Sequence, residues 1–214
     1  MPEILLATRN PGKLREIRQI GALHSWTWHG LDEFPHVPDA PEDADTFEEN
    51  ARRKALHYAA ATSLLTLADD SGLEVDALGG EPGVRSARYA GEPRDDRRNN
   101  ARLVAALAGK PWQQRTARFR CAMALARPGQ VLLETQGVIE GMILDEPRGS
   151  SGFGYDPHFF VPTLGLTLAE LPAHQKNAVS HRGRALREML EQMETLFGQP
   201  KAEPPQSWGG RTGP

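Results

Sequence analysis

The pattern of apolar and polar positions along the chain predicts a succession of strands and helices. Strands are expected at Ile4–Thr8, Leu64–Ala68, Thr116–Ala126, Gln130–Ile139 and His158–Val161. Helices are expected at Gly12–Ile20, Thr46–Ala61, Asp95–Leu107 and Ser180–Phe197. In the first helix Leu14, Ile17 and Ile20 recur at helical spacing and share one face. Because Pro128-Gly129 is a turn signal between two strands, the pattern alone indicates an α/β protein with an antiparallel hairpin.

Polar residues mark where some of these elements begin and end. Thr46, or Asp45 before it, resembles a capping box together with Glu49 and favours a helix start there. The segment Asp32–Asp45 is rich in Pro, Asp and Glu and is predicted to be a loop, as is Gly79-Gly80.

The composition indicates a globular protein with enough chain for a substantial core. It has 214 residues, a hydrophobic fraction of 39% and a formal net charge of −3. We expect a single domain over residues 1–197, followed by a disordered tail at Gly198–Pro214, which is rich in Gly, Pro and polar residues. The near-neutral charge argues against a dedicated nucleic-acid partner. In the locally basic run Arg94–Arg102, the aspartates favour a solvated helix face.

The single cysteine and the absence of long apolar segments bear on the cellular compartment. Cys121 lies in an apolar run, so a buried thiol is expected and an internal disulfide is excluded. No segment has the length of a signal peptide or the roughly 20 apolar residues that span a bilayer. We therefore expect a cytoplasmic protein with no membrane partner.

Two adjacent carboxylates, Asp69 and Asp70, follow the predicted strand Leu64–Ala68, and we expect Ser71 and Gly72 to turn the chain. Neighbouring side chains of a strand point in opposite directions, so the two carboxylates face different surroundings. Ligands often bind at such a strand end in α/β proteins. Taken alone, the pattern fits a ligand site and an ordinary polar turn about equally well.

The junction between the first strand and helix has the features of an anion site. Pro11 suits the first turn of a helix, where backbone N–H groups are free to bind an anion. Lys13 adds a mobile positive charge. The Gly-x-x-x-x-Gly-Lys-Ser/Thr pattern is absent, so this is not a Walker loop.

Two further segments carry candidate ligand-binding side chains. In the glycine-rich run Gly149–Pro157, Phe153 and Tyr155 flank Gly154 and could present an aromatic face to a flat ring, or could simply cover the core. Ser180 is a plausible helix N-cap. Lys176, His181 and Arg182 gather at the positive end of that helix, where cations are disfavoured unless an anion is present.

Together these segments resemble the inosine triphosphate pyrophosphatase family over nearly the whole chain, from about Ile4 to Phe197. The motifs that carry the resemblance are Thr8-Arg-Asn-Pro-Gly-Lys13, Thr46-Phe-Glu-Glu-Asn-Ala51, Ala68-Asp-Asp-Ser-Gly-Leu73, Gly83-Val-Arg-Ser-Ala-Arg-Tyr89, Gly152-Phe-Gly-Tyr-Asp-Pro157 and Ser180-His-Arg182. Arg9 and His158 depart from the usual pattern. The resemblance implies an elongated two-lobed α/β fold with a long curved mixed sheet flanked by helices, and an active cleft between the lobes.

The resemblance also implies an activity and a set of site residues. The family hydrolyses non-standard purine nucleoside triphosphates (ITP, dITP and XTP) to the monophosphate and pyrophosphate, with Mg²⁺ as cofactor, as a homodimer. Glu42 and Asp70 are the expected metal ligands, and Asp70 the expected proton acceptor, with Asp69 as its rival. The expected substrate-binding residues are Thr8, Arg9, Asn10, Pro11, Gly12, Lys13, Ser71, Phe153, Gly154, Tyr155, Asp156, Lys176, His181 and Arg182.

Hydrogen-bond logic suggests how the base is selected. Hypoxanthine and xanthine carry an O6 acceptor where adenine carries an amino donor, so the donors of His181 and Arg182 would favour the keto bases. An unpaired buried donor costs about 1–3 kcal/mol, which gives roughly tenfold discrimination or more per contact.

Two alternatives remain at this point. One is a pyrophosphatase of the related fold that acts on pyrimidine triphosphates, which would not need the Phe153 and Ser180-His-Arg182 segments. The other is a non-catalytic nucleotide- or RNA-binding module that uses Arg94–Arg102 and exposed aromatics. The carboxylates Asp69 and Asp70 argue against the binding module, because a protein that only binds an anion gains nothing from them beside a phosphate.

Overall fold

The computed structural model describes residues 2–22, 24 and 26–198. Its strands are β1 (Glu3–Leu6), β2 (Thr27–Gly30), β3 (Leu65–Val75), β4 (Thr116–Arg127), β5 (Gln130–Ile143), β6 (Phe159–Val161) and β7 (Leu166–Thr167). Its α-helices are α1 (Pro11–Gly21), α2 (Phe47–Thr62), α3 (Asp96–Ala106), α4 (Ala173–Val179) and α5 (His181–Phe197). Apart from Gly198, the predicted tail lies outside the described residues.

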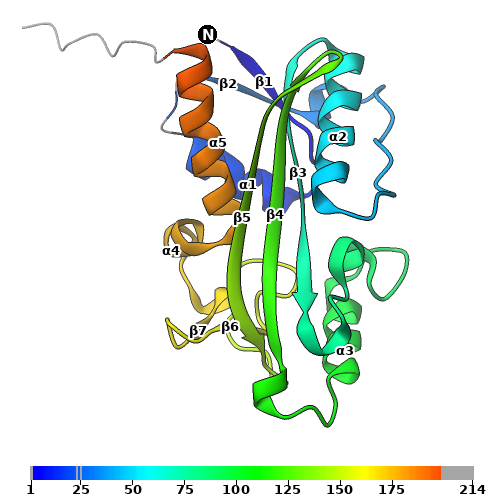
Figure 1. Ribbon diagram of the computed structural model, residues 1–214, viewed down its shortest axis with the longest axis vertical. Coiled ribbons are helices and arrows are strands. Elements are labelled where there is room, and N and C mark those ends of the chain that lie inside the picture. The colour runs from blue at the N-terminus through cyan, green and yellow to red at the C-terminus, as the bar shows by residue number, and fades with distance from the viewer. Residues whose placement is uncertain (1, 23, 25, 199–214) are drawn as a thin grey trace, which may run out of the picture.

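A seven-stranded mixed sheet runs through the molecule in the order β2-β1-β3-β4-β5-β6-β7. β1 pairs in parallel with β2 and β3, and the later pairs are antiparallel. The long strands β3, β4 and β5 extend along most of the molecule, with α1, α2 and α5 around one end (Figure 1). α3, β6 and β7 lie toward the other end. The predicted α/β class, with a mixed sheet flanked by helices, is confirmed.

Separate cores at the two ends of the long strands form two lobes. Because strand side chains alternate between faces, Leu67 packs with Ile17 and Met189 beneath α1 and α5, whereas Ala68 packs with Phe47 beneath α2. The core of the other lobe has its own apolar residues, among them Leu73, Leu103, Phe119 and Phe159. The cleft described below lies where these lobes meet.

β3 continues past the point where the sequence predicts a turn, so the expected turn at Ser71-Gly72 is wrong. The backbone stays paired with β4 through this stretch, with Ser71 opposite Cys121 and Gly72 opposite Arg120. A Cβ on Gly72 would come within 2.4 Å of the Ser86 Oγ and 2.5 Å of a backbone oxygen. The glycine therefore allows a close approach of residues 83–86 to the strand.

Polar side chains cap the helices where the sequence predicts helix starts. Asn10, Thr46, Asp95 and Ser180 each accept hydrogen bonds from backbone N–H groups of the first turn that follows. Cys121 is buried in β4, as expected. The short elements β2, β7 and α4 were not predicted. Within the described ranges, no helix is long and apolar enough to cross a bilayer.

Candidate active site

A cleft of about 350 Å³ opens between the two lobes, which is within the usual range for a small-molecule site. Its walls come from residues 7–13, the loop before α2, the middle of β3, residues 84–88, residues 153–156 and the start of α5. The candidate segments of the sequence therefore meet at one place.

The loop into α1 holds its backbone with its own side chains. The Asn10 side-chain oxygen accepts from the Gly12 and Lys13 N–H groups at 2.9 and 3.4 Å, and the Asn10 N–H donates to the Thr8 hydroxyl at 3.2 Å. Pro11 occupies the first helical turn, as predicted. A Cβ on Gly12 would lie 2.5 Å from the Phe153 ring, so only glycine lets the loop and the ring pack together.

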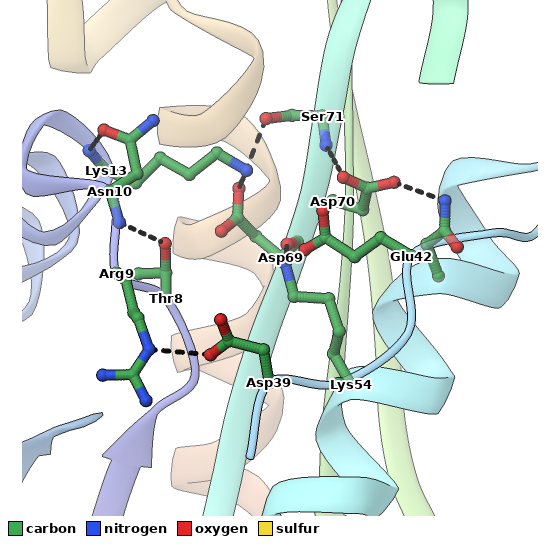
Figure 2. Close-up of polar contacts among 12 residues, drawn as sticks. Thr8, Arg9, Asn10, Lys13, Asp39, Glu42, Lys54, Asp69, Asp70 and Ser71 are labelled. Atoms are coloured by element: carbon green, nitrogen blue, oxygen red, sulfur yellow. Dashed lines mark hydrogen bonds and ion pairs between the residues drawn. The ribbon is translucent and has the colours of Figure 1, made fainter. Parts of the chain in front are cut away.

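Asp69 is a buried carboxylate surrounded by cations. Lys13 Nζ lies 2.8 Å and Arg182 Nε 3.2 Å from its Oδ2, to which the Ser71 hydroxyl donates at 3.3 Å (Figure 2). Burial opposes its ionisation, but the Lys13 and Arg182 charges hold the pKa of Asp69 well below its ordinary value. This carboxylate stays ionised and serves as a counter-ion to the two cations.

Asp70 points to the other side of β3, as the strand alternation predicts, and has different partners (Figure 2). Asn50 Nδ2 donates to it at 2.9 Å and the Ser71 N–H at 3.0 Å. Within the described part of the chain, no cation lies within ion-pair distance of it. Burial raises the pKa of Asp70 against the pull of Lys13 and Lys54. A buried carboxylate held only by neutral donors can still accept a cation or a proton.

Glu42 reaches the same side of β3 from the loop before α2. Lys54 Nζ lies 2.6 Å from it and also donates to the Asp69 carbonyl oxygen at 2.9 Å, while Arg88 lies 3.8 Å from Glu42. Residues 2–22, 24 and 26–198 contain no group of three or more His, Cys, Asp or Glu arranged as a metal site. Two carboxylates nonetheless suit Mg²⁺, which commonly takes one or two carboxylates together with substrate phosphate and water.

A buried ionic network joins α1, the 153–156 loop and α5. Glu16 pairs with Arg182 at 2.5 Å and with Lys176 at 2.8 Å, and Lys176 pairs with Asp156 at 2.5 Å. The Ser71 hydroxyl accepts from Arg182 at 2.7 Å. Arg182 is therefore largely engaged by carboxylates and a hydroxyl, rather than pointing freely into the cleft as base selection would suggest.

The aromatic residues of the site have unequal roles. Phe153 is half-buried, with Lys176 Nζ 4.7 Å from its ring centroid. Tyr155 is buried in the core and donates its hydroxyl hydrogen to the Ser86 carbonyl at 2.7 Å, so of the two alternatives this residue covers the core. The His181 ring stacks on Phe119 at 4.8 Å.

His181 is neutral at neutral pH. Burial, with the nearby charges of Arg182 and Lys176, pushes the pKa of His181 well below its ordinary value. Its Nδ1 is buried and has no partner among the described residues. A neutral ring can donate or accept at each nitrogen according to its tautomer.

The two departures from the family pattern lie at the margin of the cleft or outside it. Arg9 is exposed and pairs with Asp39 at 2.8 Å, which ties the loop before α1 to the loop before α2. His158 bonds to the Leu144 carbonyl at 2.9 Å and supports the backbone next to β6.

Sequence reasoning missed Glu16, Asn50 and Lys54. Glu16 follows Lys13 at helical spacing beside the apolar residue Ile17, which hints at a buried charge. Asn50 and Lys54 are also one helical turn apart. Asn50 donates to the Asp70 carboxylate, and Lys54 donates to the Asp69 backbone carbonyl and pairs with Glu42. The available signal was that both polar residues lie directly beside apolar Ala51 and Ala55 in this helix.

Comparisons with known proteins show the family to which the chain belongs. The family model described as the Ham1 family matches residues 4–192. A dITP/XTP pyrophosphatase of Geobacter sulfurreducens is 55% identical over 186 residues, which covers 87% of this chain and 94% of that protein. The dITP/XTP pyrophosphatase of Bacillus subtilis is 45% identical over 194 residues, covering 91% and 98%.

Solved structures show the same fold. The Ham1 protein of Staphylococcus aureus superposes with a TM-score of 0.81 at 39% identity, covering 91% of this chain and 99% of that one. The HAM1 protein of Coxiella burnetii also gives 0.81, at 44% identity, covering 92% and 98%.

Proposed function

The chain belongs to the Ham1 family, and on that premise we propose that it hydrolyses ITP, dITP and XTP to the nucleoside monophosphate and pyrophosphate. One observation carries the proposal. Asp70 of β3 lines the cleft and, among the described residues, has no cation within ion-pair distance, whereas its neighbour Asp69 is fully buried and neutralised by Lys13 and Arg182. A site that only binds anions does not need a carboxylate such as Asp70 in its lining.

Glu42 and Asp70 are the residues that would hold Mg²⁺. When bound, the metal supplies positive charge against the phosphate oxygens. Asp70 is also placed to orient a water molecule and take its proton, and its raised pKa suits a general base better than the lowered pKa of Asp69 does. Lys54 keeps Glu42 close to the strand.

The phosphate chain would bind at the start of α1. The Thr8 and Ser71 hydroxyls and the Lys13 ammonium lie along this wall of the cleft. The Gly12 and Lys13 N–H groups, which the sequence suggested would be free for an anion, donate instead to the Asn10 side chain. Water adds to the α-phosphate, the bond to the β-phosphate breaks, and pyrophosphate leaves. Asp70 accepts the proton that the water loses.

The purine base would lie on Phe153, with Asp156, Lys176, His181 and Arg182 around it. Stacking on an aromatic ring favours any flat base. The remaining N–H groups of Arg182, and a neutral His181 with its proton directed outward, would favour an O6 acceptor over an amino group. The contacts of Arg182 with Glu16 and Asp69 fix the direction of those N–H groups.

Pyrophosphate release from purified protein tests this function. The substrates are ITP, dITP, XTP, GTP, ATP and dTTP, each with Mg²⁺ and with excess EDTA. We expect rapid release from the first three and little from the others, with all activity lost in EDTA. Preference for dTTP, or tight binding of ITP without turnover, would overturn the proposal.

We further propose that the enzyme acts as a homodimer in the cytoplasm, where nucleoside triphosphates are made and used. Light scattering across the micromolar range is expected to give about twice the chain mass of 23.5 kDa. A particle of one chain mass throughout that range contradicts the dimer.

A further inference from the structure

The first turns of α3 hold both backbone polar groups of Gly154. The Gly154 N–H donates to Asp96 Oδ2 at 2.9 Å, and the Gly154 carbonyl accepts from Asn100 Nδ2 at 2.9 Å. These partners lie 58 and 54 residues away in the sequence. α3 thus reaches across to a loop that belongs to the segment before β6.

The side-chain amide of Asn100 makes hydrogen bonds to both Gly154 and its own helix. Its amide group also donates to the Asp96 carbonyl at 2.9 Å, so both N–H bonds are used. Its Oδ1 is buried and has no partner within the described ranges. An unsatisfied buried oxygen is costly, so the packing of α3 alone does not account for this side chain.

Gly154 is a place where the loop needs such support. It has a φ of +61°, and nothing lies within 4 Å of the position of a Cβ, so the residue has no side-chain packing of its own. Glycine loses more conformational freedom on ordering than any other residue. Without the two bonds to α3, the Gly154 N–H and carbonyl would lose their hydrogen-bond partners, and this side of the loop would be less restrained.

Phe153 is held by a separate set of contacts on its other side. Its N–H donates to Asp156 Oδ2 at 2.8 Å, and Asp156 is itself fixed by Lys176. The bonds from Asp156 and those from α3 therefore fix successive residues of one loop. The Phe153 ring that these contacts flank packs directly against Gly12.

We propose that Asn100 and Asp96 are positioning residues that hold the Phe153 ring ready for the base of the substrate. The inference rests on the proposed function, in which Phe153 stacks on a purine. Asp96 lines the cleft, whereas Asn100 is not among the described residues that line it. Asn100 acts only through Gly154 and is the cleaner residue to test.

A ring that is already ordered lowers the entropy cost of binding. This entropy cost applies to ligands that carry the base. It does not apply to phosphate groups that bind at the start of α1. Loss of Asn100 is therefore expected to weaken IMP and ITP binding and to leave binding of inorganic tripolyphosphate unchanged.

The experiment compares wild type with Asn100→Ala, using IMP and inorganic tripolyphosphate as competitive inhibitors of ITP hydrolysis. We expect the inhibition constant of IMP and the KM for ITP to rise about fivefold, as for one side chain that must be newly ordered. The inhibition constant of tripolyphosphate and the kcat should change less than twofold. Arg97→Ala, at an exposed position of the same helix, is the matched control.

Two further variants separate positioning from simple support of the fold. Asp96→Asn keeps an acceptor oxygen for the Gly154 N–H, whereas Asp96→Ala removes it, so the first should restore the IMP affinity that the second loses. In a Phe153→Ala background, Asn100→Ala should have no further effect on IMP, because the bonds act through that ring.

Equal weakening of IMP and tripolyphosphate, unchanged IMP affinity in folded Asn100→Ala, or additive effects with Phe153→Ala would each overturn the inference. If Asn100→Ala fails to fold, the Asp96 pair gives the same comparison. Failure of the proposed function is recognised separately, since wild type would then not hydrolyse ITP at all.

Discussion

Adjacent residues of one strand acquire opposite electrostatic character in this protein because they face opposite sides of the sheet. Asp69 meets Lys13 and Arg182, whereas Asp70 meets the neutral amide of Asn50. The charges near Asp69 lower its pKa, while burial raises that of Asp70. The difference assigns a structural role to one carboxylate and leaves the other available for chemistry.

We predict that Asp70→Asn abolishes most ITP hydrolysis and leaves the fold intact. The change keeps the size of the side chain and removes the charge, so kcat should fall about 10²-fold or more, as for a lost acid–base group. Steady-state pyrophosphate release measures this. Asp69→Asn is the comparison, since it leaves Lys13 and Arg182 poorly compensated and should lower the denaturation midpoint as well. Near-normal turnover of Asp70→Asn would rule out its catalytic role.

Arg182→Ala should destabilise the protein strongly. It leaves Glu16 and Asp69 buried with fewer counter-charges, and breaking a buried ion pair costs about 3–5 kcal/mol. Urea unfolding of this variant measures the loss, with Arg15→Ala, at an exposed position of α1, as the control. A loss below about 1 kcal/mol would mean that the ionic network contributes little.

At the residue scale, the sequence indicates which types of side chain gather but not how they pair. The motifs single out Lys13, Asp69 and Arg182. Lys13 and Arg182 line the cleft, and Asp69 is buried behind them in contact with both. Arg182 was expected to face the base, yet Glu16 engages it from 166 residues away. Such long-range pairing depends on the packing of α1 against α5, which no local pattern encodes.

At the element scale, β3 shows how local turn signals can mislead. Asp, Ser and Gly favour turns, but here each residue from Thr66 to Val75 lies opposite a residue of β4 in the antiparallel pair. Pairing of this stretch with β4 therefore overrides its local preference for a turn. Most strands and helices with long periodic patterns were predicted within a few residues, whereas β2, β7 and α4 are too short to show a period.

Gly72→Ala tests this account of β3. The added Cβ would lie 2.5 Å from the Gly83 backbone oxygen, which cannot move aside as a flexible side chain could. We expect a loss of about 1–3 kcal/mol in unfolding free energy, as for an overpacked core. Urea denaturation provides the measurement. Unchanged stability would show that residues 83–86 are free to move away from the strand.

At the scale of the whole molecule, the long strands join two lobes that have separate cores, and the cleft between them is lined from both. α5 begins at this junction. Its first residue, His181, stacks on Phe119 of the core of one lobe, and its later apolar residues pack in the core of the other. The protonation state of His181 therefore bears on how well the lobes are held together.

We predict that stability falls as the pH drops below about 6.5, and that His181 accounts for much of the fall near that pH. An unfolded histidine binds a proton with a pKa near 6.5, whereas in the folded protein burial and the Arg182 charge lower the pKa of His181. Between these two pKa values the unfolded state binds more protons, so unfolding becomes easier as the pH falls, by up to about 1.4 kcal/mol per pH unit.

Urea unfolding of wild type and His181→Phe at pH 7.5, 6.5 and 5.5 measures this contribution. Phenylalanine keeps the stack on Phe119 but cannot be protonated, so its unfolding free energy should change less between pH 6.5 and 5.5 than that of wild type. Asp69 does not contribute to the difference measured here, because its pKa is lowered in the folded protein and its protonation reduces stability only below about pH 4. The raised pKa values of Asp70 and Asp156 work in the opposite direction, and both proteins share them. Identical pH dependence in the two proteins would show that His181 is protonated in the folded state as readily as in the unfolded chain.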